Sequence, residues 1–294
     1  MDRISPTGDL AFKKVFASEE NKDVLGGLIR DYFEITAEEI TIENPYSIDA
    51  YREFVNNKEV AVLRHTLTDV SASFKTADFI SELQVKKTRF FDERVLYYPF
   101  ERFCKNYSKE GRMVIGSDGK PFRYSSLRPV YALNILGYTH FQNDDEALRI
   151  FEMYDPKRNK GFGKELLRIG FFELTKTNVE TANQQHWHDY FTTGVVMPDA
   201  PEYIKKASRT IEFVNLGEEE RTVALAIERA QAIHDAEIVS SFLDGKDEGR
   251  AEGRTEGRTE GIYAVVRNLL KRNRPIDEIM EDTGLTREEV EKLK

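Results

Sequence analysis

Two carboxylates in neighbouring segments of alternating polarity are the residues of this chain best suited to chemistry. Asp69 lies in the first segment, and Glu82 lies 13 residues later in the sequence Ser-Glu-Leu-Gln-Val-Lys of the second. This separation fits a hairpin that returns both carboxylates to one point. Paired carboxylates bind a hard divalent cation, and a cation held in this way is a common means of cutting phosphodiesters. The spacing therefore predicts metal-dependent hydrolysis at a carboxylate pair.

The two segments, residues 67–74 and 79–86, have the period-2 pattern of half-buried β-strands. In the first strand we expect Asp69 on the polar face with Ser71 and Ser73. A slip of one residue would bury the polar row, so the pattern defines the two faces well. In the second strand the polar face carries Ile80, Glu82, Gln84 and Lys86, and the apolar face carries Phe79, Ser81, Leu83 and Val85.

The turn between these strands sets their register. If Thr76 and Ala77 form its centre, the numbers of facing residues sum to 153. Asp69 would then face Gln84 and lie diagonal to Glu82, about 7–8 Å away, a distance from which two side chains can converge on one ion. The same pattern is also typical of the solvent-facing side of an ordinary antiparallel sheet, so both interpretations stay open at this point.

Helices and further strands must position this hairpin. Residues 21–34 place apolar side chains at helical spacing and predict an amphipathic helix. Residues 90–107 read as an aromatic-rich helix in which Pro99 marks a break or kink, and we expect Cys104 to be a buried, inert thiol there. The other predicted elements are strands at 129–136, 147–154 and 165–174, the last two with a helical alternative, and helices from 200 to about 243.

A change in composition follows. Residues 245–261 repeat Glu-Gly-Arg-Thr/Ala every four residues. Periodic glycine disfavours a helix, which indicates a solvated linker or a fraying helical extension, and the alternative is a glycine-faced helix along which two chains associate. Residues 262–294 predict a helix–turn–helix hairpin whose glutamate-rich second helix is poorly suited to reading DNA. We therefore divide the chain into a domain at 1–243, the repeat at 244–261 and the hairpin tail at 262–294.

Composition limits the class of protein. The 294 residues are 40% hydrophobic, enough for one large domain or two small ones. The net charge of −9 disfavours a nonspecific DNA binder, so any contact with nucleic acid must use a local patch. The chain shows no signal-peptide core and no apolar run of ~18 residues, which predicts a cytoplasmic protein without membrane contact. His186 and His188 have a chelate-like spacing, but no third ligand adjoins them, so zinc is disfavoured.

Several short motifs occur in a recognisable order. They are Gly-Asp-Leu-Ala-Phe-Lys-Lys-Val-Phe at 8–16, the pair Asp69 and Glu82-Leu-Gln, the aromatic helix with Arg94 and Tyr98, and the Glu-Gly-rich stretch before a small helical tail. Taken together they resemble the PD-(D/E)XK nuclease family transposases, also called the Rpn family of recombination-promoting nucleases. The resemblance extends over nearly the whole chain.

This resemblance implies an α/β fold with a restriction-endonuclease-like core, a mixed central sheet flanked by helices, and a helical C-terminal extension. It also implies cleavage of DNA that depends on Mg²⁺ or Mn²⁺. Asp69 and Glu82 would be the metal ligands, and the backbone carbonyl of Leu83 would add a third oxygen. Gln84 stands at the last motif position, where the superfamily signature has lysine; it can orient a water or a phosphate oxygen, but it carries no charge.

Cations near the carboxylates could supply that missing charge. Lys86 is predicted on the same strand face as Glu82, and Arg94 on the next helix is an alternative phosphate ligand. Lys13 and Lys14 are candidates for contact with the DNA backbone, although a solvated surface is the competing interpretation for both.

Three functions follow from these observations. The first is a metal-dependent DNA endonuclease that promotes recombination, on a mobile element or in defence. The second is a catalytically degenerate nuclease fold that binds DNA or a protein, which Gln84 and the acidic composition favour. The third is a metal hydrolase of a different phosphodiester. A homo-oligomer formed through residues 245–294 is a further expectation.

Overall fold

The computed structural model describes residues 3–56, 70–162 and 165–294. The chain divides into two compact units, Met1–Arg229 and Ala230–Lys294. The first unit contains the β-sheet and the second is helical.

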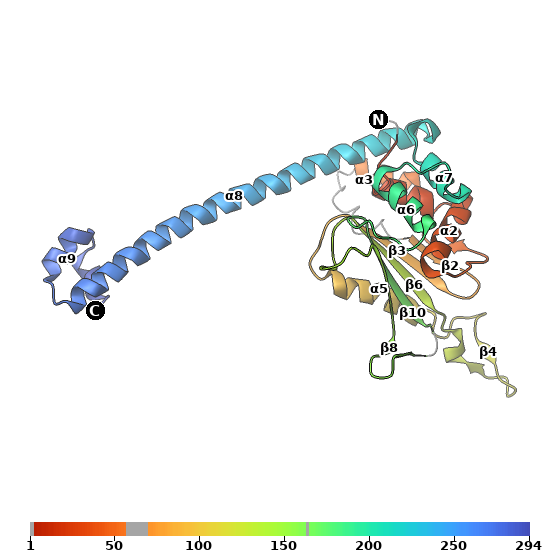
Figure 1. Ribbon diagram of the computed structural model, residues 1–294, viewed down its shortest axis with the longest axis horizontal. Helices are drawn as coiled ribbons and strands as arrows, with labels where there is room; N and C mark the ends of the chain where they lie inside the picture. The colour runs from red at the N-terminus through yellow and green to blue at the C-terminus, as the bar shows by residue number, and fades with distance from the viewer. Residues whose placement is uncertain (1–2, 57–69, 163–164) are drawn as a thin grey trace. The chain divides into compact units, whose positions relative to one another are not determined.

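A mixed six-stranded sheet is the framework of the first unit (Figure 1). Its strand order is β1-β2-β3-β6-β10-β7. The β3–β6 and β6–β10 pairs are parallel, and the β1–β2, β2–β3 and β10–β7 pairs are antiparallel, which confirms the predicted mixed sheet. The strands are β1 (Thr41–Ile42), β2 (Val70–Ser73), β3 (Asp78–Gln84), β6 (Val130–Leu136), β7 (Leu148–Glu152) and β10 (Leu167–Glu173).

The middle of the sheet is covered on both faces. Every residue of β6 is buried, because its sequence Val-Tyr-Ala-Leu-Asn-Ile-Leu is almost continuously apolar, as is usual for parallel strands with helices on both sides. The strands predicted at 129–136, 147–154 and 165–174 are all present as β6, β7 and β10. The helical alternative for the last two is wrong, because both pair in register along one ladder.

One face of the sheet packs against a group of four helices, which Figure 1 places around the labels α2, α6 and α7. Their large apolar side chains form the main core with the odd-numbered residues Phe79 and Leu83 of β3. Trp187 is fully buried there, as the sequence predicts for a packing residue, and its indole Nε1 donates to Asp31 Oδ2 at 2.9 Å. The helices are α1 (Asp9–Phe16), α2 (Lys22–Phe33), α6 (Ala182–Thr193) and α7 (Glu202–Thr210).

The opposite face is covered by α5 (Phe91–Lys105), which packs on β6 (Figure 1). Phe91 and Val95 of the helix form a second core with Ala132, Leu136 and neighbouring side chains. The predicted aromatic helix is confirmed, and it continues past Pro99. Smaller elements complete the unit. They include the helix α3 (Ile48–Asn56) and two hairpins, β4 (Val114–Ile115) with β5 (Pro121–Phe122) and β8 (Tyr154–Asp155) with β9 (Lys160–Gly161). The 3-10 turns are η1 (Glu19–Asn21), η2 (Arg123–Ser126) and η3 (Phe213–Asn215).

The β2–β3 hairpin differs from the predicted hairpin in register. Val70 pairs with Ser81, so the numbers of facing residues sum to 151 and not to 153. The backbone N–H of Phe74 donates to the carbonyl of Ala77 at 2.9 Å, which places the centre of the turn one residue earlier than expected. The sequence pattern could not detect this, because a relative shift of two residues leaves every side chain on the same face.

The predicted faces are confirmed along β2 and β3. Burial alternates along both strands, and the odd-numbered residues of β3 are the more deeply buried. The second strand is shorter than predicted, since it ends at Gln84. Val85 and Lys86 lie in the bend that follows, and Val85, expected on the buried face, is 47% exposed because it no longer belongs to the sheet.

The long helix α8 (Glu218–Lys271) begins in the first unit and supplies much of the second. It continues through the repeat at 245–261, so of the predicted alternatives, a solvated linker or a helical extension, this segment is helical. A Cβ added at Gly249, Gly253 or Gly257 would meet no atom within 4 Å. The side chains of the repeat are exposed.

The predicted helical hairpin at the C-terminus is confirmed as α9 (Ile276–Thr283) and α10 (Arg287–Glu291). Its core consists of Val266 from the end of α8 with Ile279 and Val290. Thr286 begins α10 with a capping box, in which its side chain and that of Glu289 each accept a hydrogen bond from the other's backbone N–H. Across the described part of the chain, the helices that are long enough to span a bilayer are not apolar enough to do so.

Candidate active site

Glu82 lies on the face of β3 that is turned towards α5. Its side chain is 11% exposed, and it sits opposite Asn134 in the parallel pairing with β6. The alternation of β3 requires this position, because Phe79, Ser81 and Leu83 all point to the other face. The carboxylate is therefore held at the edge of the second core, nearly buried but still in contact with solvent.

Arg94, in the first turns of α5, connects the candidate residues. Its Nε lies 3.5 Å from Glu82 Oε2, the separation of a loose ion pair, and its NH2 donates to Gln84 Oε1. The guanidinium also lies 5.8 Å from the centre of the Phe91 ring. A positive charge from the helix thus contacts Gln84, whose own side chain is neutral.

Gln84 and Lys86 differ in their contacts and in their position relative to the strand. Gln84 Nε2 donates to the backbone carbonyl of Lys86 at 2.6 Å, so the amide spans from Arg94 to the bend after β3. Lys86 is exposed and lies beyond the end of the strand, which corrects its predicted place on the strand face beside Glu82. Leu83 lies between the two polar residues in sequence, and its side chain packs in the main core.

Asn134 is a neighbour of Glu82 that sequence reasoning missed. It is 4% exposed on β6, and its Nδ2 donates to the carbonyl of Gly170 at 3.1 Å. The signal was present, because Asn134 is the one polar residue in an otherwise apolar strand. A small pocket beside Glu82 is lined by Ile80, Glu82, Val95, Tyr98, Pro99, Ala132, Leu133 and Asn134.

Tyr138 adds a titratable group near these residues. Burial raises the pKa of its phenol to about 12, the positive charge of Arg94 opposes this rise, and the carboxylates of Asp92 and Glu82 add to it. The hydroxyl is buried and makes no hydrogen bond with the described residues. Tyr138 therefore stays protonated at neutral pH.

The other predicted metal ligand, Asp69, lies outside the described residues. It directly precedes Val70, whose partner across the hairpin is Ser81, the residue before Glu82. The donors assigned to the metal are carboxylate and carbonyl oxygens, a set that suits Mg²⁺ or Mn²⁺. The described residues by themselves contain no cluster of three or more His, Cys, Asp or Glu side chains that could hold an ion. The residue types fit a hard cation, and such a cation would compete with Arg94 for Glu82.

The two N-terminal lysines are less accessible than a surface contact with DNA would suggest. Lys13 is 4% exposed on α1. Lys14 pairs with Glu220 at 2.5 Å and lies 5.4 Å from the centre of the Tyr46 ring, whose hydroxyl donates to the same carboxylate at 2.9 Å. A phosphate contact by Lys14 would require this ion pair to open.

Three further side chains from the sequence are accounted for by packing and exposure. His188 forms a hydrogen bond with the carbonyl of Leu174 at 3.1 Å, and His186 lies 3.9 Å from Asp199, so the two rings have separate partners and do not converge. Cys104 is exposed, contrary to the expected buried thiol, because it lies on the outer side of α5.

The opposite end of β3 carries a second carboxylate on the same face. Asp78 is fully buried, and its Oδ2 accepts from Arg102 Nε at 2.9 Å and from Asn106 Nδ2 at 2.7 Å. Arg102 also binds Glu43 through two nitrogens, and Arg112 lies 3.8 Å from Asp78 Oδ1. Burial lowers the pKa of Arg102, but its hydrogen bonds to Glu43 and the charge of Asp78 raise it overall.

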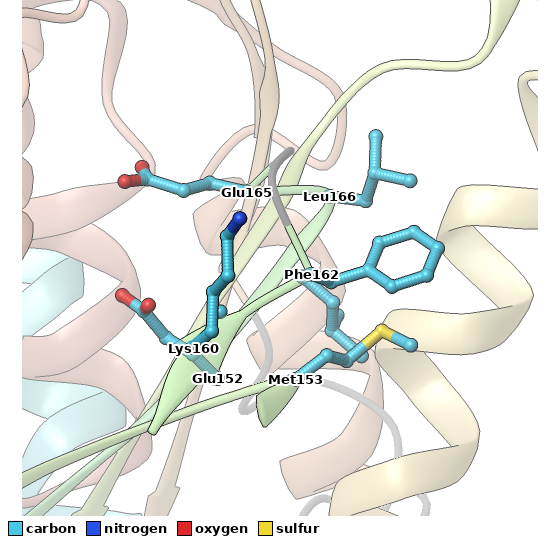
Figure 2. A pocket seen from close by; sticks show the side chains of 8 residues that line it. Glu152, Met153, Lys160, Phe162, Glu165 and Leu166 are labelled. Atoms are coloured by element: carbon cyan, nitrogen blue, oxygen red, sulfur yellow. The ribbon is translucent and has the colours of Figure 1, made fainter. Parts of the chain in front are cut away.

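A larger pocket lies away from β3, between β7, β9 and the start of β10 (Figure 2). Glu152, Lys160 and Glu165 line one side of it, and Met153, Phe162 and Leu166 line the other. Glu152 is already paired with Arg168. This mixture of one lysine with two glutamates does not form a set of converging ligands, and we assign no chemistry to it.

A comparison with protein-family models finds a match over most of the chain. The family model described as PD-(D/E)XK nuclease family transposase matches residues 6–241. The matched range contains the strands and the helix that present Glu82, Gln84, Arg94 and Asn134. Comparisons with curated proteins and with solved structures give no significant match.

Proposed function

The chain belongs to the PD-(D/E)XK nuclease family transposases, and from this premise we propose that it is a metal-dependent DNA endonuclease that promotes recombination. The observation that carries the proposal is the arrangement on β3, where Glu82 and Gln84 share one face and both contact Arg94. A nuclease-type function follows from the family; dependence on Mg²⁺, the DNA substrate and recombination are the parts that need testing.

We assign the chemistry to oxygen donors on two adjacent strands. Asp69 and Glu82, with the backbone carbonyl of Leu83, would hold a divalent cation. Bound there, Mg²⁺ or Mn²⁺ would lower the pKa of a water molecule and offset the charge that develops on the phosphate. Support for this assignment comes from the low exposure of Glu82 and from the register, which pairs Val70, the residue after Asp69, with the residue before Glu82.

The remaining side chains would bind and orient the DNA phosphate. In the absence of DNA, Arg94 bridges Glu82 and Gln84. A guanidinium forms strong paired hydrogen bonds with phosphate oxygens, so Arg94 would turn from the loose contact with Glu82 to the substrate. The amide of Gln84 would then be released to orient the attacking water or a phosphate oxygen. Lys86, exposed at the end of the strand, would supply a further positive charge.

The first test is nicking of supercoiled plasmid DNA by the full chain in Mg²⁺, Mn²⁺, Ca²⁺ or EDTA. We expect open-circular or linear product in Mg²⁺ or Mn²⁺ and none in EDTA. Asp69→Ala and Glu82→Gln should each lower the rate about 1,000-fold, because either change removes a charged oxygen from the site. Lys86→Ala should lower the rate about tenfold at saturating metal.

Glu202→Gln is the matched control, because the side chain of Glu202 is 76% exposed on α7 and the change is the same as at position 82. It should cleave like the parent protein. If Glu82→Gln cleaves at the parental rate while folded, the site assignment is wrong.

A catalytically degenerate fold that binds DNA or a protein is the second candidate. The observation in its favour is that Gln84 replaces the signature lysine and is itself engaged by Arg94. Absence of cleavage in every metal, from protein with a normal circular-dichroism spectrum and melting transition, would favour this function. Cleavage of small phosphodiesters or RNA in preference to DNA would point to a different hydrolase.

A further inference from the structure

An exposed row of aromatic and apolar side chains follows the outer face of α5, the helix whose inner side carries Arg94. Leu96, Phe100 and Cys104 lie four residues apart, and Tyr97 adjoins them, so the four share one side of the helix. Their exposed fractions are 49% for Leu96, 60% for Tyr97 and 48% for Phe100. A surface helix of an isolated domain would normally carry polar residues here.

Aromatic side chains extend this row at both ends. Before the helix, Phe90 is 74% exposed and has a left-handed backbone conformation, with φ of +58°, which is unusual for a bulky residue and is typically retained at functional positions. Beyond the helix, the exposed rings of Tyr107 and Tyr124 lie 5.1 Å apart between centroids. We call the exposed side chains Phe90, Leu96, Tyr97, Phe100, Cys104, Tyr107 and Tyr124 the aromatic row.

The charge around the aromatic row differs from that of the rest of the protein. Residues 86–128, which contain the row, carry eleven Lys or Arg and five Asp or Glu, a net charge of +6, whereas the remainder of the chain carries −15. Five of these cations are already paired: Arg94, Arg102 and Arg112 with carboxylates outside the segment, and Lys105 and Lys120 with Glu101 and Asp118 inside it. The local basic patch that an acidic protein needs for nucleic acid therefore depends on the remaining cations of the segment.

The cations gather at the two ends of the row. Lys87 and Arg89 are exposed before the helix, beside Phe90, and Lys109 and Arg123 lie beyond it, beside Tyr107 and Tyr124. For these four side chains, no ion pair is formed with the part of the chain that the structure describes. Their charges are available to a polyanion that runs along the helix.

We propose that the aromatic row of α5, with the basic side chains at its two ends, binds single-stranded DNA by base stacking. Exposed rings interleaved with cations are the chemistry that recognises unpaired bases, because each base offers a flat face to a ring while the backbone phosphates meet the cations. Bases within a duplex are stacked on one another and cannot reach such rings. The row occupies the outer side of the helix whose inner side carries Arg94, so a bound strand would lie across α5 from the candidate active site.

This proposal rests on the proposed function for its biological meaning, but its test does not require cleavage. Binding of the full chain to a fluorescent oligothymidylate of about 20 nucleotides is measured by anisotropy in EDTA, against a duplex of the same length. We expect the single strand to bind at least tenfold more tightly than the duplex. Retained binding in a protein that never cuts DNA would leave this proposal standing and contradict only the nuclease, whereas cleavage without single-strand preference would do the reverse.

Variants of exposed residues locate the surface without disturbing the core. Tyr97→Ala with Phe100→Ala should weaken binding to the single strand about 50-fold, and Phe90→Ala about tenfold. The matched control is Tyr154→Ala with Phe242→Ala, since these aromatics are 52% and 68% exposed outside the segment. It should bind like the parent protein.

The dependence of binding on salt provides an independent readout. Replacing Lys87 and Arg89 by glutamate should make the slope of log affinity against log salt concentration shallower by about 1.4, because two phosphate contacts are lost. An unchanged slope, equal affinity for single strand and duplex, or equal weakening by the control variants would overturn the proposal. It would also be overturned if the protein self-associates in sedimentation and Tyr97→Ala with Phe100→Ala makes it monomeric, because the row would then be a contact between two copies.

Discussion

The two ends of β3 present the same chemistry to α5 and use it differently. Asp78 and Glu82 lie four residues apart on one face of the strand, and Arg102 and Arg94 lie eight residues apart on the helix. Four strand residues and eight helix residues both span about 12–13 Å, so an antiparallel helix brings each arginine to one carboxylate. The geometry repeats, but the length of the ion pair and the burial of the carboxylate differ between the two ends.

At the Asp78 end the carboxylate is shielded from solvent. Asp78 is fully buried and accepts hydrogen bonds of 2.9 Å from Arg102 and 2.7 Å from Asn106. At the Glu82 end the ion pair is 3.5 Å long, Glu82 is 11% exposed and Arg94 is 25% exposed. Close, buried pairs hold a structure together, whereas a loose pair at a solvent edge can exchange its partner for a ligand. The comparison therefore separates a structural carboxylate from a candidate catalytic one.

The largest expected difference is in stability. Asp78→Asn should lower the free energy of unfolding by about 3 kcal/mol, because it leaves the charge of Arg112 without Asp78 and that of Arg102 with Glu43 alone, next to a buried site. Glu82→Gln should lower it by less than about 1 kcal/mol. Urea denaturation followed by circular dichroism measures both, and similar losses for the two variants would break the distinction.

Exchange of each arginine for lysine should further distinguish the two ends of β3. Arg102→Lys is expected to cost about 2 kcal/mol, since a lysine cannot reproduce the fork that binds Asp78 and Glu43 together. Arg94→Lys should cost less than about 1 kcal/mol, because it affects one loose ion pair with Glu82 and one partly exposed hydrogen bond to Gln84. Chemical denaturation of the two single variants gives the comparison, and a larger cost at position 94 would contradict it.

The pH dependence of stability should differ at the Asp78 end. Hydrogen bonding to Arg102 lowers the pKa of Glu43 below its ordinary value of 4.5. Because the folded-state pKa is the lower one, the stabilisation is complete above about pH 4.5 and is lost as the pH falls through the folded-state value. Glu43→Gln should therefore destabilise the protein by about 1 kcal/mol at pH 7, and the difference from the parent protein should shrink in acid. Thermal melts from pH 7 to pH 3 test this; a constant difference would be evidence against the contact.

The smallest effect is expected at Tyr138, near the Glu82 end. Its buried hydroxyl forms no hydrogen bond with the described residues, so Tyr138→Phe removes a desolvated polar group. The variant should be as stable as the parent protein or up to about 1 kcal/mol more stable, measured in urea. A loss of more than about 1 kcal/mol would show that the hydroxyl contributes to the folded state.

The contrast between the two ends also explains which parts of the site were predictable. Alternation along β3 correctly places Glu82 and Gln84 on one face, because a strand has a strict period of two. The predicted register was wrong: the numbers of paired residues sum to 151 and not to 153. The geometry of the turn, and not the polarity pattern, decides the register. Asn134 and the bridge from Arg94 to Gln84 involve β6 and α5, and no local pattern in β3 specifies what packs against its face.

In two other regions, too, local sequence patterns did not determine the structure. Cys104 was expected to be buried because it lies in an aromatic helix, but the aromatic residues occupy both sides of α5 and only the packing on β6 defines the inner side. The glycine repeat left a linker and a helical extension open as predictions, and it lies within α8. The propensity of glycine is a modest cost per residue, and it did not prevent the repeat from continuing the helix.

The sequence by itself determined the order of the elements, the polar face of β3 and the family, because period-2 and helical spacing and short motifs are local properties. Tertiary structure decided that Asp78 is shielded from solvent and that Glu82 stays partly accessible. That outcome depends on where α5 meets the sheet, because the position of the helix sets how closely each arginine approaches its carboxylate and how deeply the pair is buried. Two carboxylates that look alike on one strand therefore acquire different roles from the contacts that folding brings to each.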